Sequence, residues 1–171
     1  MRLLLVLLLM AGLVAPAIGQ TLDPVIHEGT IEASPEAVWE AWATSEGLSS
    51  WTAPHADIDL RVGGLMRANY DANGILGDDQ TIENRILSFE PGHMLSIQVA
   101  KPPAGFPFSQ AVSSMWSVVY VEPEESGATR LRIVSMGFDA SDESQAMRAF
   151  FERGNAVTLR ALQAHFANRP R

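Results

Sequence analysis

The chain has 171 residues, with 12 Lys or Arg and 20 Asp or Glu, so that its formal net charge at pH 7 is −8. An acidic chain without a basic stripe is a poor candidate for binding nucleic acid or an anionic membrane surface. It contains no cysteine, which excludes disulfides, thiol nucleophiles and thiolate metal sites. Its stability must therefore come from a hydrophobic core, and the chain is long enough to bury one.

The first residues are predicted to be an export signal. A basic residue precedes an apolar run, LLLVLLLMAGLV, and small residues follow at Ala17 and Gly19. This order is typical of a secretory signal cleaved before Gln20. The alternative is a retained membrane anchor, but the run is shorter than the ~20 residues that a spanning helix needs. We therefore expect residues 1–19 to be a signal peptide, residues 20–171 to form a single domain, and the mature protein to be periplasmic or secreted.

The mature chain is predicted to begin with a strand and two short helices. The strand is expected at about Val25–Ala33. Ser34 then provides an N-cap, with Pro35 at the first helical position. Gly47 is expected to interrupt this helix, and Leu48–Trp51 to form a second helical turn. One side of the first helix is apolar, with Val38, Trp39 and Trp42.

Six further strands are predicted after the helices, each bounded by turn residues. They are expected at His55–Val62, Leu65–Asp71, Thr81–Phe89, Met94–Ala100, Val112–Val121 and Ala128–Met136. Asn73-Gly74, after the second of these, is a hairpin signal. The short connections indicate an antiparallel meander, and the alternation of polar and apolar residues gives the sheet one wet and one dry face.

A long amphipathic helix is predicted at the end of the chain. Ser141 is its N-cap, and two acidic residues follow in the first turn, where the helix dipole favours them. Gly154 costs about 1 kcal/mol in a helix interior relative to Ala. Two explanations for a glycine at this position are open. One is close helix–sheet packing or a kink, and the other is room for a ligand. The predicted buried face collects Met147, Phe150, Phe151, Gly154, Thr158, Ala161, Leu162 and His165.

This order of elements resembles that of the helix-grip, or START-like, superfamily of SRPBCC proteins. The segments that carry the resemblance are IEASPEAVWEAWATSEGLSSWTAP, DIDLRVGGLMRANYD, the Phe89-Glu90-Pro91 turn with Leu95, RLRIVSMGF and FFERGNAVTLRALQAHF. They are similar to the AHSA1-like branch, related to activator of Hsp90 ATPase, over about Val25–Phe166. The resemblance implies an α+β fold, in which a curved antiparallel sheet of about seven strands surrounds the C-terminal helix and leaves a cavity.

The resemblance specifies the fold more closely than the function, because the superfamily includes apolar-ligand carriers, polyketide cyclases and a co-chaperone domain. Two positions depart from the pattern of the branch. Thr52 stands where a second aromatic residue is frequent, and Asn155 stands where a Trp commonly follows the Gly of the last helix. Both departures make the expected edge of the pocket more polar.

The sequence contains no recognisable catalytic or metal-binding motif. The four histidines, His27, His55, His93 and His165, are far apart and lack HExxH or His-x-His spacing. Residues 71–74, DANG, place Gly fourth where a calcium loop needs it sixth, and are read as a turn. We therefore expect neither a metal nor a cofactor.

The candidate ligand-binding residues are those that alternation directs into the enclosed space. They are Trp51 at the mouth, Tyr70, Asn84, Ile97 and Trp116 on the strands, and Phe151, Asn155, Thr158 and His165 on the last helix. The large hydrophobic members are more simply explained as core. Asn84 and Thr158 are more telling, because a polar group in a dry interior costs ~1–3 kcal/mol unless it is hydrogen-bonded.

Three functions remain open at this point. The first is an exported small-molecule-binding protein that holds an apolar or aromatic ligand between the long helix and the sheet. The second is a cyclase- or hydrolase-type enzyme using the same cavity, with Tyr70, His165 or a carboxylate as acid or base. The third is a co-chaperone-like interaction module, which export would separate from a cytosolic chaperone. A pocket with polar atoms but no converging titratable pair would favour binding, which is our hypothesis. Stable membrane insertion after signal cleavage is not expected, and the oligomeric state is left open.

Overall fold

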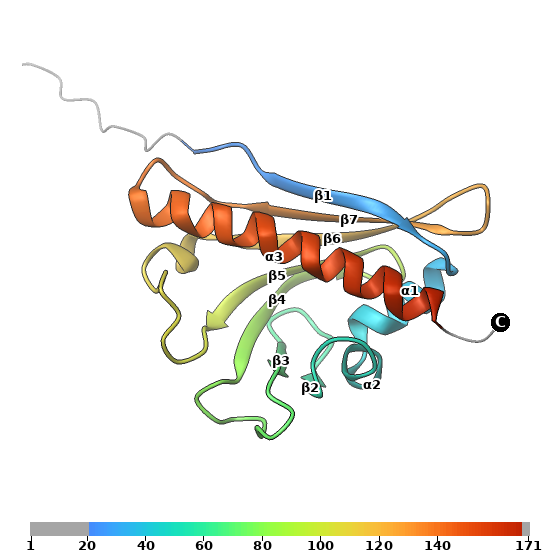
Figure 1. Cartoon of the computed structure of the whole chain (residues 1–171), viewed down its shortest axis with the longest axis horizontal. Coiled ribbons are helices and arrows are strands. Elements are labelled where there is room, and N and C mark those ends of the chain that lie inside the picture. The colour runs from blue at the N-terminus through green and yellow to red at the C-terminus, as the bar shows by residue number, and fades with distance from the viewer. Residues whose placement is uncertain (1–20, 169–171) are drawn as a thin grey trace, which may run out of the picture.

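One antiparallel sheet of seven strands and one long helix dominate the computed structural model, which describes residues 21–168 (Figure 1). The elements are β1 (Val25–Ile31), α1 (Pro35–Ala43), α2 (Ser45–Ser49), β2 (His55–Ile58), β3 (Leu65–Asn69), β4 (Ile82–Glu90), β5 (Met94–Lys101), the 3-10 helix η1 (Ala111–Ser114), β6 (Trp116–Pro123), β7 (Thr129–Met136) and α3 (Asp142–Ala167). The strand order is β1-β7-β6-β5-β4-β3-β2. The predicted meander is therefore confirmed, and β1 joins it at the β7 edge.

The break between the first two helices lies at Thr44, not at Gly47 as the sequence suggested. Thr44 ends α1 by donating its backbone N–H to the Glu40 carbonyl, and its side chain accepts a bond of 2.9 Å from the Gly47 N–H at the start of α2. Gly47 lies inside α2, where a Cβ atom would overlap the Glu40 carbonyl oxygen. The glycine thus allows the two helices to pack closely. The predicted cap is confirmed, since the Ser34 side chain accepts from the Ala37 N–H.

The connection between β3 and β4 is longer than the hairpin predicted from Asn73-Gly74. The turn itself exists, with the Gly74 N–H donating to the Asp71 carbonyl at 3.0 Å. The chain then continues through a second turn around Asp78 before β4 begins at Ile82. Asp78 accepts bonds from the side chain of Asn69 and from backbone and side-chain donors of the loop, and these bonds stabilise the longer path.

The long helix packs mainly against β1, at one edge of the sheet, and makes fewer contacts with η1 and β7 (Figure 1). It passes close to β1 at Gly29, where a Cβ atom would lie 3.2 Å from Cδ2 of Leu159. Its buried residues are Ser144, Met147, Asn155, Leu159, Leu162 and Phe166. The predicted buried face shares Met147 and Leu162 with this set and was otherwise wrong, because Phe150, Phe151 and Thr158 border a cavity.

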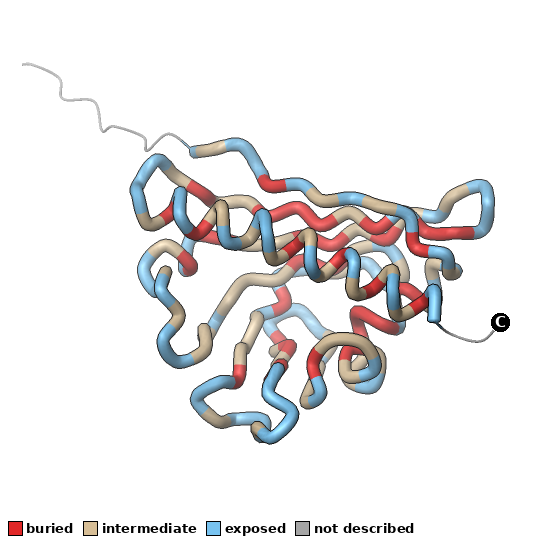
Figure 2. Tube along the Cα trace, in the orientation of Figure 1, coloured by how far each residue is buried: buried red, intermediate tan, exposed pale blue. Residues whose placement is uncertain are grey.

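Two groups of buried apolar side chains make up the core. The larger one joins α1 and the C-terminal half of α3 to the sheet, and the smaller one surrounds Phe138 and Met147 near the start of α3. Figure 2 shows many of the buried positions on β6 and β7 and along one side of α3. Within residues 21–168, no helix is long and apolar enough to cross a bilayer. The predicted signal peptide lies outside the described residues.

Candidate functional site: a cavity between the long helix and the sheet

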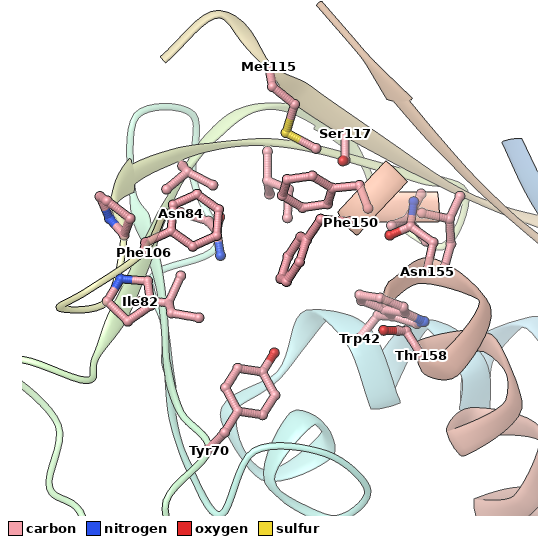
Figure 3. A pocket seen from close by; sticks show the side chains of 17 residues that line it. Trp42, Tyr70, Ile82, Asn84, Phe106, Met115, Ser117, Phe150, Asn155 and Thr158 are labelled. Atoms are coloured by element: carbon pink, nitrogen blue, oxygen red, sulfur yellow. The ribbon is translucent and has the colours of Figure 1, made fainter. Parts of the chain in front are cut away.

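A cavity of about 270 Å³ lies between α3 and the concave face of the sheet (Figure 3). This volume is close to the lower end of the range of small-molecule pockets, ~300–1,000 Å³. The cavity exists because α3 contacts the β1–β7 side of the sheet, whereas the facing wall is built from β4, β5 and β6. Its lining residues are Trp42, Tyr70, Ile82, Asn84, Ile97, Val99, Pro102, Pro103, Phe106, Met115, Ser117, Val119, Ile133, Phe150, Phe151, Asn155 and Thr158.

Six of the nine residues proposed from the sequence line this cavity. They are Tyr70, Asn84, Ile97, Phe151, Asn155 and Thr158. Trp51, Trp116 and His165 are not among the lining residues. Whether the six contact a ligand stays a prediction, but the structure brings them around one space.

The three predicted residues that do not line the cavity lie in different parts of the fold. The Nε1 atom of Trp51 donates a 2.9 Å bond to the Ala41 carbonyl, so the ring is held against α1 and packs against the larger core group. Trp116 is on the opposite face of β6 from Ser117 and Val119, which line the cavity, because successive side chains of a strand alternate between its two faces. His165 lies in the last turn of α3, where its ring makes an edge contact with Phe166 at 5.0 Å.

Trp42 is a cavity residue that the sequence analysis did not assign. It lies on the apolar side of α1, and its ring packs edge-on against Trp51 with centroids 5.3 Å apart. Trp42 is 8% exposed, and its Nε1 atom has no hydrogen-bond partner among the described residues. The position of Trp42 four residues after Val38 indicated a buried ring, but not that this ring would face a cavity.

A short chain of polar side chains crosses the cavity wall. The Nδ2 atom of Asn155 on α3 donates to Oγ of Ser135 on β7 at 3.0 Å. Oγ of Ser135 in turn lies 2.8 Å from Oγ of Ser117 on β6. Ser117 and Asn155 line the cavity, and Ser135 is fully buried between them. The serines were also missed from the sequence, although the alternation that places Leu131 and Ile133 on the dry face continues to Ser135.

Tyr70 lies at the mouth of the cavity. The residue as a whole is 57% exposed, but Figure 3 shows the hydroxyl directed into the cavity. Burial raises the pKa of this hydroxyl above its ordinary value of 10.0, and a hydrogen bond with the Thr52 side chain lowers the pKa by a smaller amount. Tyr70 is therefore protonated and neutral at physiological pH. Thr52, which stands where a second aromatic residue is frequent in the AHSA1-like branch, thus contributes to the polar edge of the site.

Aromatic residues close the side of the cavity next to the start of α3. Phe106 and Phe108, in the loop before η1, each contact Phe150 of α3 with ring centroids 5.7 Å apart. The same loop is held to α3 by Glu143, whose Oε1 accepts bonds from the N–H groups of Gln110 and Ala111. The loop is thus anchored to α3 by apolar and polar contacts.

The cavity has little capacity for acid–base or metal chemistry. None of its 17 lining residues is Asp, Glu, Lys, Arg or His, and Tyr70 is the titratable member. Across residues 21–168, no group of three or more His, Cys, Asp or Glu side chains is arranged to hold a metal ion. The arrangement suits an uncharged apolar molecule oriented by a few polar groups.

The family model described as "Activator of Hsp90 ATPase homolog 1-like protein" matches residues 32–167. The chain belongs to this family. Its α+β helix-grip fold is that of the AHSA1-like branch of the START-like superfamily, as the sequence predicted. A comparison with curated protein sequences found no match.

Solved structures of AHSA1-like proteins have the same fold. The Aha1 dimer from Colwellia psychrerythraea, with a TM-score of 0.65 and 19% identity, aligns over 85% of this chain and 96% of that one. The AHSA1-like protein from Aeromonas hydrophila, with a TM-score of 0.60 and 17% identity, aligns over 83% and 90%. A protein from Mesorhizobium loti, MLL2253, has a TM-score of 0.65 and 20% identity over 87% and 100%. At these identities the comparisons establish the fold.

Proposed function

We propose that this AHSA1-like protein binds a small apolar or aromatic molecule in the cavity between α3 and the sheet. The observation that carries the proposal is an uncharged cavity of about 270 Å³ whose wall contains polar groups at Tyr70, Asn84, Ser117, Asn155 and Thr158. This combination is typical of binding sites for small molecules, in which apolar walls provide affinity and a few polar groups provide orientation. An engineered apolar cavity of ~150 Å³ holds benzene, so a molecule of one or two rings fits the space.

The chemistry of the cavity favours binding over catalysis. A general acid or base needs a pKa near the working pH. Burial moves the pKa of Tyr70 upward and away from neutrality, and the other lining residues contribute no second titratable group. The converging acid–base pair that would favour a cyclase or hydrolase is therefore missing from the cavity wall.

The proposed site of action is outside the cytoplasm. The support is the apolar run at the start of the chain and the small residues before Gln20, which are typical of a cleaved secretory signal. The proposed ligand would accordingly be a molecule of the periplasm or of the surroundings of the cell.

Two neighbouring residues of α3 provide a matched test of the site. Thr158 lines the cavity, whereas the adjacent Val157 is 57% exposed on the outer surface. Thr158→Phe fills the cavity, and Val157→Phe adds the same side chain outside it. We expect Thr158→Phe to weaken binding of 2-naphthol, a neutral two-ring probe, at least tenfold, and Val157→Phe to leave it unchanged. Titration calorimetry measures both, and equal effects would contradict the proposal.

The natural ligand is sought by native mass spectrometry of the protein purified from its own host. A bound small molecule that is displaced by 2-naphthol would support the proposed site. A bound molecule that stays in place when 2-naphthol saturates the protein would place the natural ligand elsewhere.

A further inference from the structure

The buried hydroxyl of Ser135 determines which polar groups the cavity presents. Ser135 is 0% exposed, so its hydrogen must find an acceptor within the protein. Its Oγ already accepts from Nδ2 of Asn155, and Oγ of Ser117 is the acceptor that the described residues offer it. The hydrogen bonds therefore run from Asn155 to Ser135 and from Ser135 to Ser117.

This direction leaves one donor and one acceptor facing the cavity. Ser117 uses a lone pair for Ser135, so its own O–H can donate to a ligand. Asn155 uses its amide hydrogen for Ser135, and its Oδ1 makes no hydrogen bond to any residue in the range 21–168. Figure 3 shows the oxygens of both residues on the cavity side. Turning the amide around would reverse the chain and exchange the two roles, so the cavity offers one donor and one acceptor in either case.

A hydroxyl group on the ligand complements this pair, because it donates one hydrogen bond and accepts others. A carboxylate has no hydrogen to donate to Asn155. It would also be buried without a cation, because the wall contains no Lys, Arg or His, and burying an unpaired ion is costly. An ammonium group has no lone pair to accept the hydrogen of the Ser117 hydroxyl. It would also be buried without a carboxylate in the cavity wall to balance its charge.

We propose that the ligand is an uncharged molecule whose hydroxyl group binds between Ser117 and Asn155. This inference rests on the proposed function, since it specifies the ligand of the same cavity. It makes Ser117 and Asn155 specificity-determining residues, because a purely apolar ligand would leave both of their cavity-facing groups unpaired.

Three two-ring probes of similar shape test the inference on the mature protein. We expect 2-naphthol to bind three- to tenfold more tightly than 2-methylnaphthalene, the difference that one or two hydrogen bonds provide. We expect 2-naphthoate not to compete with either probe, because it is charged. Calorimetry or competition fluorescence gives the three affinities.

Ser117→Ala is expected to reduce the preference for 2-naphthol over 2-methylnaphthalene to less than twofold. Ser117→Thr, which keeps the hydroxyl, is expected to retain the preference. Ser96→Ala is the matched control, because Ser96 is a buried serine on the neighbouring strand β5 whose alternation with Ile97 places it on the opposite face of the sheet. We expect it to bind as the wild type does.

The outcomes separate the two proposals. If both neutral probes bind and Thr158→Phe weakens them, but the preference is absent or survives Ser117→Ala, the hydroxyl assignment is overturned and the binding function stands. Competition by 2-naphthoate at similar affinity would also overturn it. If neither neutral probe binds, or if Thr158→Phe has no effect on binding, both proposals fail.

Discussion

Asn155 of α3 and Ser135 of β7 are joined by a hydrogen bond of 3.0 Å at the boundary between the core and the cavity. The bond connects the long helix to the sheet through two side chains of which one is fully buried and the other is 9% exposed. It holds α3 at a defined orientation next to a space that no side chain fills. The same pair therefore contributes to stability and shapes the polar end of the proposed site.

Removing the Asn155 side chain is expected to destabilise the fold. Asn155→Ala leaves the buried Ser135 oxygen without its donor, and such a loss costs about 1–3 kcal/mol in free energy of unfolding. Urea unfolding measures it. Glu152→Ala, at an exposed position of the same helix, is the control and is expected to change stability by less than about 0.5 kcal/mol. Equal values for the two variants would show that the Asn155–Ser135 bond adds nothing to stability.

Gly154 and Gly47 are expected to respond in opposite directions to substitution by Ala. A Cβ atom at Gly154 would meet no atom within 4 Å, and Gly154 does not line the cavity, so neither close packing nor a ligand accounts for this glycine. Gly154→Ala should stabilise the protein by about 1 kcal/mol through helix propensity, with 2-naphthol binding unchanged. Gly47→Ala should destabilise it, because the new methyl group overlaps the Glu40 carbonyl. Thermal unfolding distinguishes the two signs, and a destabilised Gly154→Ala variant would contradict the placement of Gly154.

The loop that carries Tyr70 is expected to lose stability in acid through Asp78. Hydrogen bonds hold the pKa of Asp78 below its ordinary value of 3.8, the first cause being the bond from the Ile75 N–H. A carboxyl with a lowered folded-state pKa stabilises the protein above pH 3.8, and that contribution is lost as the pH falls below 3.8 through the folded-state value.

Asp78→Asn tests this dependence, because its amide nitrogen cannot accept the bonds made to one of the two carboxylate oxygens. We expect the variant to be less stable than the wild type at about pH 5–7, and the difference to shrink as the pH falls below 3.8. Urea unfolding across the range gives the difference. Asp79→Asn, at the exposed neighbour, should follow the wild-type profile. A pH-independent difference for Asp78→Asn would rule out the titration of this carboxyl as its cause.

The predicted export signal leads to a defined mature terminus. The protein recovered from the cell envelope or medium should begin within about two residues of Gln20, because the small residues at Ala17 and Gly19 mark the cleavage site. Intact-mass measurement gives the terminus directly. A full-length chain recovered in the membrane fraction would instead favour the retained anchor.

The sequence by itself determined the elements of this protein and their order. Ser34, Pro35 and Ser141 predicted the helix starts correctly, since caps depend on atoms within a few residues. Turn residues separated six strands in the observed order, and short connections made the meander the expected topology. Two bounds were wrong: β2 ends at Ile58 instead of Val62, and β6 begins at Trp116 instead of Val112 because residues 111–114 form η1. The same local patterns were sufficient to recognise the family.

Only the tertiary structure decided which side chains surround the cavity. Ser117 rather than Trp116 faces it because the face of β6 that carries Ser117 and Val119 is the one directed toward α3. Asn155 rather than Gly154 lines it because α3 packs mainly against β1, at the edge of the sheet. Trp42 lines the cavity with its ring packed against that of Trp51, which the Ala41 carbonyl holds in place. These outcomes depend on contacts between residues far apart in the chain, and periodicity along one segment does not contain that information.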